Sequence, residues 1–389
     1  MEKNIFLEPL WNLHFYQNLM ISHPPKGFKF TTNQNSKANK LAKTGSRSHS
    51  IQRTLNFSSK FLPINLIKSW SQRSVVIPED SLLTYSIDHI IFRNEPWIVE
   101  VEYATALVGS HPNQLQRAKQ FVESRLKSPQ CKRIICWSEA GKQSLINDLD
   151  IREIEEKIEL IYLGAMPRKF TKMYDTGTVK LLFIGSGSTT GAFEGRGAKV
   201  FDIFDQLSND YPSLELIVRS DVPPSIKKRY AETKKVTIYD HPVPQETLNS
   251  LLESADIFLL PSYGTLPVTI LEAMSYELPV ITIDSWANNE YVEDGITGFV
   301  SPRSEHIHGY FPGTKQPGFL GPHYRKAIKT TDAMEIQGLA ERVRTLIENP
   351  ELRRSFGKAG RKAIEEGKFS FQKMNDQLRR VFLESLENR

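Results

Sequence analysis

Short apolar runs alternate with amphipathic stretches in two separate parts of the chain, and this alternation constrains the fold more than any other feature. The apolar runs are roughly four to seven residues long, and the helical patterns between them span about 10 to 15 residues. Strands that are apolar throughout and separated by helices are typical of parallel sheets covered on both faces. The sequence therefore predicts an α/β fold with two doubly wound units.

The two series can be assigned to residue ranges. In the first, strands are predicted at 97–103, 132–138 and 157–163, and helices at 113–127 and 138–149, where Ser138 is the expected N-cap. In the second, strands are predicted at 179–187, 213–220, 235–240, 256–262, 278–283 and 297–301, and helices at 198–209, 245–254 and 268–276. Beyond residue 331 the pattern is wholly helical.

These series divide the chain into two Rossmann-like domains. We expect an N-terminal domain over 1–166, a linker over 167–178, a C-terminal domain over 179–365, and a final helix over 366–389 that packs back on the first domain. Residues 31–60 are rich in Asn, Ser, Thr and Lys and lack apolar periodicity, so we expect a loop or a disordered segment there.

Charge is distributed unevenly. The chain has 389 residues and a formal net charge of +5, yet the stretch from Pro9 to Pro78 contains ten Lys and Arg and no Asp or Glu. The remaining residues therefore sum to −5. The length excludes a single small binding module. The basic stretch suits an anionic partner or an anionic membrane surface, and a solvated loop is the alternative.

Cysteine content and hydropathy bear on the compartment. Cys131 and Cys136 are too few for a disulfide framework in a chain this long, and the residues around them are typical of a buried strand. No apolar run approaches the ~18 residues that cross a bilayer, and the chain start lacks the pattern of a secretory signal. We expect a cytoplasmic protein, soluble or peripherally associated with a membrane.

The most specific segment is the strand, loop and helix over 256–284. An apolar strand leads into a loop with Gly264, and the following helix has Pro267 near its first turn and Glu272 on its second. A helix N-terminus offers unpaired N–H groups and a positive dipole end, and glycine lets an anion approach the backbone. The segment suits a diphosphate, with Glu272 placed to accept ribose hydroxyls. An ordinary helix start with a solvated glutamate is the alternative.

The string PSYGTLPVTILEAMSYELPVI, residues 261–281, resembles the signature of the retaining glycosyltransferases of family 4, which have the GT-B architecture. In that family a strand ending in Pro-Ser leads to one glutamate and, after seven residues, to a second within LEAM. Glu272 matches the second, which holds the nucleotide ribose in the family. The first falls on Gly264, so the usual donor-sugar contact is absent. The segment EYVEDGITGFVSP, 290–302, continues the resemblance.

The segment LLFIGSGSTTGAFEGRGAKVFDIFDQL, 181–207, resembles the glycine loop of the same family. The family commonly has an arginine after the first glycine and a lysine before the later one, both facing the donor diphosphate. Here Ser186 takes the first place, and Arg196 before Gly197 stands for the lysine. The resemblance implies donor contacts from Gly187, Arg196 and Gly197, since a guanidinium binds phosphate through two N–H groups. Taken alone, the glycines fit simple turns equally well.

The resemblance implies further donor contacts and one candidate on the acceptor side. The implied donor contacts are His241 and Val243 at the nucleobase, Gly264, Thr265 and Leu266 near the sugar, and Pro267 at the diphosphate. Related chains often carry a histidine where this one has Glu102, at the end of the strand over 97–102. A carboxylate there can act as a base or can cap a nearby loop. We take Glu102 and Arg196 as the candidate catalytic residues.

Two groups that resemble metal ligands are interpreted as structural. Asp148 and Asp150 form an Asp-x-Asp pair, but they close a predicted helix that no apolar strand directly precedes. His306, His308 and His323 lie in a Gly- and Pro-rich stretch without a recognisable ligand spacing. We therefore expect no metal ion and no cofactor besides the nucleotide-sugar substrate.

The resemblance implies a metal-independent retaining glycosyltransferase with a GT-B fold, two domains facing a cleft. It would move a sugar from a nucleotide sugar to a hydroxyl of a glycan, lipid or small molecule. One alternative is a GT-B protein without transfer activity that binds nucleotide sugar or glycan beside an active subunit, as Gly264 and Ser186 favour. A nucleotide-sugar epimerase is another, although LEAM argues against it. Nucleic acid is not an expected partner, because no base-stacking aromatic pattern accompanies the charges.

Overall fold

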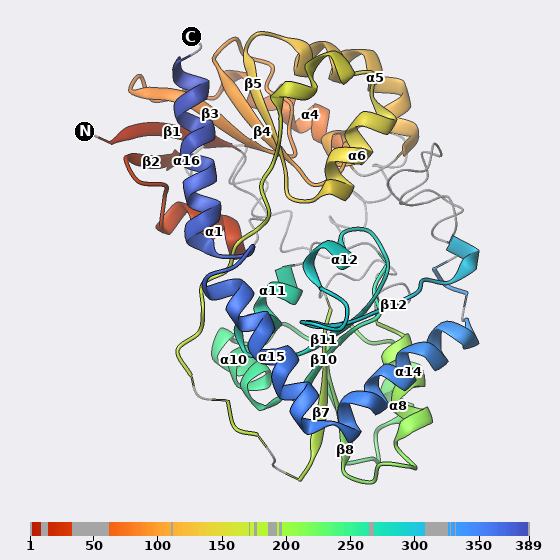
Figure 1. Ribbon diagram of the computed structural model, residues 1–389. Coiled ribbons are helices and arrows are strands. Elements are labelled where there is room, and N and C mark those ends of the chain that lie inside the picture. The colour runs from red at the N-terminus through yellow and green to blue at the C-terminus, as the bar shows by residue number, and fades with distance from the viewer. Residues whose placement is uncertain are drawn as a thin grey trace. The chain divides into compact units, whose positions relative to one another are not determined.

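The computed structural model describes residues 2–8, 15–32, 62–109, 112–170, 172–174, 177–185, 193, 197–263, 268–307, 326, 328–330 and 332–387. These residues form two compact units (Figure 1). The first contains the described residues up to 164 and the last helix, and the second contains those from 165 to 370. Each unit has one six-stranded sheet in which every pairing is parallel, so the predicted α/β class is confirmed.

The sheet of the first unit has the strand order β2-β1-β3-β4-β5-β6. The strands are β1 (Lys3–Glu8), β2 (Phe28–Thr32), β3 (Ser81–Ile87), β4 (Trp97–Val101), β5 (Cys131–Cys136) and β6 (Ile158–Leu160). The helices are α1 (Phe15–Ser22), α4 (Ile64–Ser71), α5 (Pro112–Lys127), α6 (Glu139–Asp148) and α16 (Phe371–Glu387), with 3₁₀ helices η1 (Gln72–Ser74), η2 (Ala104–Val108) and η3 (Arg152–Lys157). The sequence pattern predicts β4, β5 and β6 and misses β1, β2 and β3.

The core of this sheet is centred on β4 and its neighbour β5. Every residue of β4 is buried, and Val99 and Val101 belong to a core cluster that also contains Cys131 and Cys136 of β5. Both cysteines are free thiols in the buried strand that the sequence predicts. Ser138 caps α6 as expected, because its hydroxyl accepts a hydrogen bond from the Gly141 N–H at 2.9 Å.

Glu100 is a carboxylate buried in β4. Side chains alternate across a strand, so it lies on the face opposite Val99 and Val101. Its Oε1 accepts hydrogen bonds from the Tyr16 hydroxyl at 2.8 Å and the Gln17 amide at 2.5 Å, and its Oε2 accepts one from the Tyr85 hydroxyl at 2.5 Å. Burial raises the pKa of Glu100 to about 7, against the effect of these three donors.

The final helix, α16, covers the strands at one side of the same sheet. Figure 1 shows it in blue against β1, β2 and β3. The Phe382 ring packs edge-on against Phe28 and Tyr85, with ring centroids 5.3 and 5.8 Å apart. The Asn375 amide donates a hydrogen bond to the His23 carbonyl at 2.9 Å. The first sheet is therefore completed by residues from the far end of the chain.

The sheet of the second unit has the strand order β12-β11-β10-β7-β8-β9. The strands are β7 (Val179–Ile184), β8 (Leu214–Arg219), β9 (Val236–Tyr239), β10 (Ile257–Leu260), β11 (Val280–Ile283) and β12 (Gly298–Ser301), all expected from the sequence. The helices are α8 (Lys199–Leu207), α9 (Pro224–Arg229), α10 (Gln245–Ser254), α11 (Val268–Ser275), α12 (Asn288–Tyr291), α14 (Ala333–Glu348) and α15 (Pro350–Glu365), with the 3₁₀ helix η4 (Glu305–Ile307).

The described part of 167–178, which we expected to be a linker, packs within the second unit. The Lys172 side chain is buried, and its ammonium donates hydrogen bonds to the carbonyls of Glu253 and Ala255 at the end of α10. The Tyr174 hydroxyl donates to the Glu277 carboxylate, although the sequence pattern of this stretch is polar.

Strand order in the second sheet reverses at β7. This strand lies between β10 and β8, and the chain proceeds outward from it in both directions. In open parallel sheets, ligands bind beyond the carboxyl ends of the strands at such a reversal point. Gly185 follows β7, and Ser262 lies just beyond β10, so both predicted donor segments begin at this edge.

Replacing Glu100 should change how stability depends on pH. The folded protein holds the Glu100 proton to about pH 7, whereas the ordinary value is 4.5, so raising the pH from about 5 to about 8 costs stability. Because a shift of this size corresponds to about 3 kcal/mol, Glu100→Gln should visibly flatten the pH dependence of thermal unfolding. Glu79→Gln, an exposed site in the same unit, is the control. Parallel pH profiles for wild type and Glu100→Gln would contradict this account.

Candidate functional site

The carboxyl edge of the second sheet contains four of the predicted donor residues. Gly197 lies just before α8, His241 and Val243 follow β9, and Glu272 lies on α11. Six others lie outside the described residues: Gly187, Arg196, Gly264, Thr265, Leu266 and Pro267. The remaining candidate, Glu102, lies in the first unit.

Glu272 has a well-defined environment. Its side chain is 14% exposed, and its Oε1 lies 4.0 Å from Nη2 of Arg168. Burial raises the pKa of the Glu272 carboxyl, while Arg168, the Gln245 amide and Arg219 act in the opposite direction. The surrounding cations thus favour the ionised form at a position where burial disfavours charge. A carboxylate held in this way is suited to accept hydrogen bonds from ligand hydroxyls.

These partners of Glu272 are absent from the sequence prediction. Arg168 lies in the stretch expected to be a linker, and its guanidinium is 5.5 Å from the centre of the Tyr276 ring. Arg219 is the last residue of β8, and Gln245 is the first of α10. A cation at the carboxyl end of a predicted parallel strand is a signal that points to Arg219. No local pattern points to Arg168.

Close packing at the strand ends requires glycine at two positions. A Cβ at Gly197 would lie 2.4 Å from the buried Phe183 ring, and a Cβ at Gly185 would lie 2.5 Å from the Ser220 hydroxyl. The Gly197 N–H donates to the Phe193 carbonyl at 2.7 Å. Gly185 and Gly197 therefore do more than permit turns, because a side chain at either would displace core atoms.

The predicted nucleobase contacts lie at the surface after β9. The His241 side chain is 69% exposed, and its Nδ1 lies 3.1 Å from Oδ1 of Asp240. Lys227 also pairs with Asp240, and these contacts lower the pKa of Asp240 to about 2. Val243 is half-buried.

A buried charge network lies between the two donor segments. The carboxylate of Glu335 in α14 accepts hydrogen bonds from the side chains of Lys199 and Tyr263. Lys199 lies two positions after Gly197, and Tyr263 lies directly before Gly264. The Ser304 N–H donates to the same carboxylate at 3.0 Å. The Lys199 ammonium also lies 4.1 Å from the centre of the Tyr263 ring. Glu335 therefore connects the residues that border both predicted loops.

Glu102 lies beyond the carboxyl end of β4 and is half-buried. Its N–H donates to Oδ1 of Asp88 at 3.0 Å, and Asp88 follows β3 with a left-handed backbone, φ 50°. Burial raises the pKa of Asp88 to about 7 and lowers that of the neighbouring His89 to about 4. The prediction misses Asp88 because β3 itself is not evident in the sequence.

Two groups of acidic and histidine residues resemble metal ligands in the sequence but are interpreted as structural. Asp148 is the last residue of α6 and half-buried, and burial raises its pKa to about 6, whereas Asp150 is exposed. His308 and His323, and the side chain of His306, lie outside the described part of the chain. Among the residues that are described, no group of three or more His, Cys, Asp and Glu side chains is arranged to hold a metal ion.

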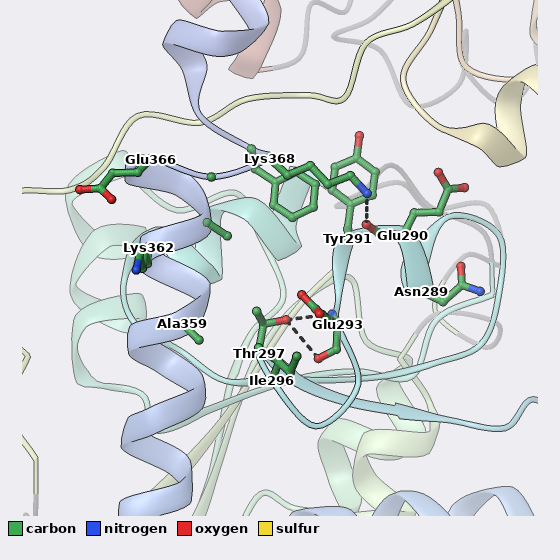
Figure 2. Close-up of a pocket in the computed structure, with 13 residues that line it drawn as sticks. Asn289, Glu290, Tyr291, Glu293, Ile296, Thr297, Ala359, Lys362, Glu366 and Lys368 are labelled. Atoms are coloured by element: carbon green, nitrogen blue, oxygen red, sulfur yellow. Dashed lines mark hydrogen bonds between the residues drawn. The ribbon is translucent and has the colours of Figure 1, made fainter.

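A cavity of about 600 Å³ lies elsewhere in the second unit (Figure 2). It lies between α12 with the turn that follows it and the end of α15, and Lys368 donates to the Glu290 carbonyl at its rim, at 3.0 Å. None of the residues that line it is a predicted donor residue. The geometry around Glu272, and not this cavity, therefore defines the candidate site.

Comparisons with known proteins point to the same region. A family model described as glycosyl transferases group 1 matches residues 189–308, a span in the second unit that includes Arg196 and Glu272. The amylovoran biosynthesis glycosyltransferase AmsK of Erwinia amylovora is 35% identical over 69 residues, which is 16% of this chain. That match spans 17% of the length of AmsK.

Solved structures share the fold over nearly the whole chain. HepE of Anabaena, in complex with UDP and glucose, has a TM-score of 0.58 at 14% identity, covering 98% of this chain and 100% of HepE. A glycosyltransferase of Rickettsia africae has a TM-score of 0.59 at 14% identity, covering 100% of both chains. The two parallel-sheet units therefore have the GT-B fold. Within the described residues, no helix is both long enough and apolar enough to span a membrane.

Breaking the buried pair in the second unit should be costly. Lys199→Met leaves the Glu335 carboxylate buried without its cation, and such losses cost about 3–5 kcal/mol. We expect urea unfolding to show a loss of this size, largely recovered in the double variant Lys199→Met, Glu335→Leu. Arg344→Ala, which breaks the exposed Arg344–Asp210 pair, should cost less than about 1 kcal/mol. A single variant as stable as this control would disprove the role of the pair.

Proposed function

We propose that this protein is a retaining glycosyltransferase that moves a sugar from a nucleotide-sugar donor to an acceptor hydroxyl. The observation that carries the proposal is the position of Glu272, on the helix after β10 at the reversal point of the second sheet, beside Arg168 and Arg219. The family match over 189–308 supports the same assignment. Because HepE has been crystallised with UDP and with UDP-glucose, we propose a UDP-sugar as the donor.

In this proposal, the residues divide the work by charge. Glu272 accepts hydrogen bonds from the ribose hydroxyls, and Arg196 neutralises the diphosphate as it leaves. The first turn of α11 contains no acidic residue, which suits a phosphate at that helix end. The acceptor hydroxyl attacks on the face that the diphosphate vacates, which retains the anomeric configuration. Glu102 is the proposed acceptor-side carboxylate.

We further propose that cationic side chains, with no metal ion, stabilise the leaving diphosphate. Guanidinium groups can neutralise the negative charge of the leaving diphosphate through paired N–H donors. An equal transfer rate with and without EDTA would support this proposal. If EDTA abolishes transfer and added Mg²⁺ restores it, the proposal is contradicted.

Glu272→Ala and Arg196→Ala should each lower donor turnover by about 100-fold or more, because each removes a charged contact to the nucleotide. Wild-type protein would be incubated with UDP-sugars and with glycan or lipid extracts, and the products identified by mass spectrometry. The exposed residues Glu341 and Arg344, each changed to alanine, are the matched controls. Full nucleotide binding and turnover in both site variants would refute the assignment. Nucleotide binding without turnover in the wild type would identify a non-catalytic binding protein.

We also propose that α4 contacts an anionic membrane surface and that the protein works in the cytoplasm. Leu62, Ile67 and Trp70 are 46–50% exposed, Val76 is 80% exposed, and the Arg73 guanidinium lies 4.0 Å from the centre of the Trp70 ring. The segment belongs to the acid-free stretch from Pro9 to Pro78. Apolar side chains interspersed with cations are suited to the headgroup region of an anionic bilayer.

Vesicle sedimentation tests this surface. Wild-type protein should bind vesicles containing phosphatidylglycerol at low salt and dissociate at high salt, and Trp70→Ser should bind about fivefold more weakly because it loses apolar area. Phe121→Ser, which changes an exposed ring on α5, is the control. Equal binding by the two variants, or no salt-sensitive binding at all, would remove the membrane from this account.

A further inference from the structure

Arg219 occupies a distinctive place in the second sheet. It ends β8, and it pairs in register with Ile184 of β7, the residue before Gly185. Its Nη1 donates a hydrogen bond to the Gly185 carbonyl at 2.8 Å. The guanidinium is therefore held at the point where the central strand ends, on the edge that also contains Glu272.

The charge of Arg219 has no close counter-ion among the described residues. Among these residues, the guanidinium of Arg219 donates a hydrogen bond to the main-chain carbonyl of Gly185, and the Glu272 carboxylate interacts with it electrostatically at longer range. Arg219 is half-buried, and burial lowers its pKa while Glu272 opposes that effect. Partial desolvation of a cation is unfavourable unless an anion compensates for it. A guanidinium has five N–H donors, so one bond to Gly185 leaves most of its donors for another partner.

The packing around Arg219 restricts its movement. The next residue, Ser220, packs closely against Gly185: a Cβ added at Gly185 would lie 2.5 Å from the Ser220 hydroxyl. The Ser220 N–H donates to the Tyr239 carbonyl at 3.0 Å, which fixes the backbone after β8 to β9. A cation anchored in this way loses little conformational entropy when it binds an anion.

We propose that Arg219 is a donor-binding residue that contacts a phosphate group adjoining the ribose held by Glu272. The proposal rests on the proposed function, because it takes the ligand of the Glu272 site to be a nucleotide. Arg219 donates a hydrogen bond to Gly185, where the glycine loop starts, and interacts electrostatically with Glu272. In this proposal, the fork of its N–H groups therefore binds the phosphate next to the ribose. It would thereby distinguish a nucleotide from the corresponding nucleoside.

The alternative role for Arg219 is structural, as a tie between β7 and β8 through Gly185. The two roles differ in what they do to ligands. A lost tie would weaken uridine and UDP alike and would lower thermal stability, whereas a lost phosphate contact weakens UDP alone.

The experiment measures UDP and uridine binding by calorimetry for wild type, Arg219→Gln and Arg219→Lys, together with the melting temperature of each without ligand. Removing a charge-assisted contact should weaken UDP binding by about 10- to 100-fold in Arg219→Gln and leave uridine binding unchanged. Arg219→Lys keeps the charge but not the fork, so its loss should be smaller and again confined to UDP. Arg344→Gln, a cation on α14 paired with Asp210, is the control.

Each outcome decides between these accounts. If the wild type binds UDP and Arg219→Gln binds it with the same affinity, the role of Arg219 is overturned and the proposed function stands. The same holds if Arg219→Gln loses affinity for UDP and uridine equally. If Arg219→Gln does not fold, the same UDP-to-uridine comparison in Arg219→Lys decides. The wild type is also titrated with GDP and ADP; if it binds none of the three nucleotides, the proposed function fails, and the assignment of Arg219 fails with it. If it binds GDP or ADP in place of UDP, that nucleotide and its nucleoside are compared in the same variants.

Discussion

Both sheets are fully parallel, and this constraint determines where the candidate site residues lie. A parallel strand must be followed by a crossover before the next strand begins, so the carboxyl ends of all strands meet at one edge. The apolar sequences of β7 and β10 bury these strands on both faces. Polar and glycine residues that follow the strands are thereby collected at the same edge. The Glu272 site is a consequence of this topology.

Buried charges then fix details that apolar packing leaves open. Glu335 accepts hydrogen bonds from Lys199 and Tyr263, which lie next to the two predicted donor loops, and its side chain has almost no solvent exposure. Glu100 has a similar arrangement in the first unit, where two tyrosines and a glutamine donate to it. Hydrogen bonds to a desolvated carboxylate are strongly directional, so each network selects one arrangement of the elements that supply its donors.

The sequence predicts the second unit far better than the first. All six strands of the second sheet follow from local apolar runs, and three of the helices between them, α8, α10 and α11, also show a clear helical period. In the first sheet, Phe382 of α16, from the far end of the chain, packs against Phe28 of β2 and Tyr85 of β3. No local pattern encodes such a partner. The same limit explains Arg168, which reaches Glu272 across more than a hundred residues of sequence.

By itself, the sequence determined the α/β class, the two sheet-forming regions, and Glu272 as the main candidate, because period, glycine placement and motif are local properties. The tertiary structure alone decided which cations surround that carboxylate. The chain has Ser186 where the family that its motifs resemble commonly has an arginine, and the fold places Arg219 of the neighbouring strand against Gly185, the residue before Ser186. Strand register brings these residues together, and register depends on the burial of the whole sheet.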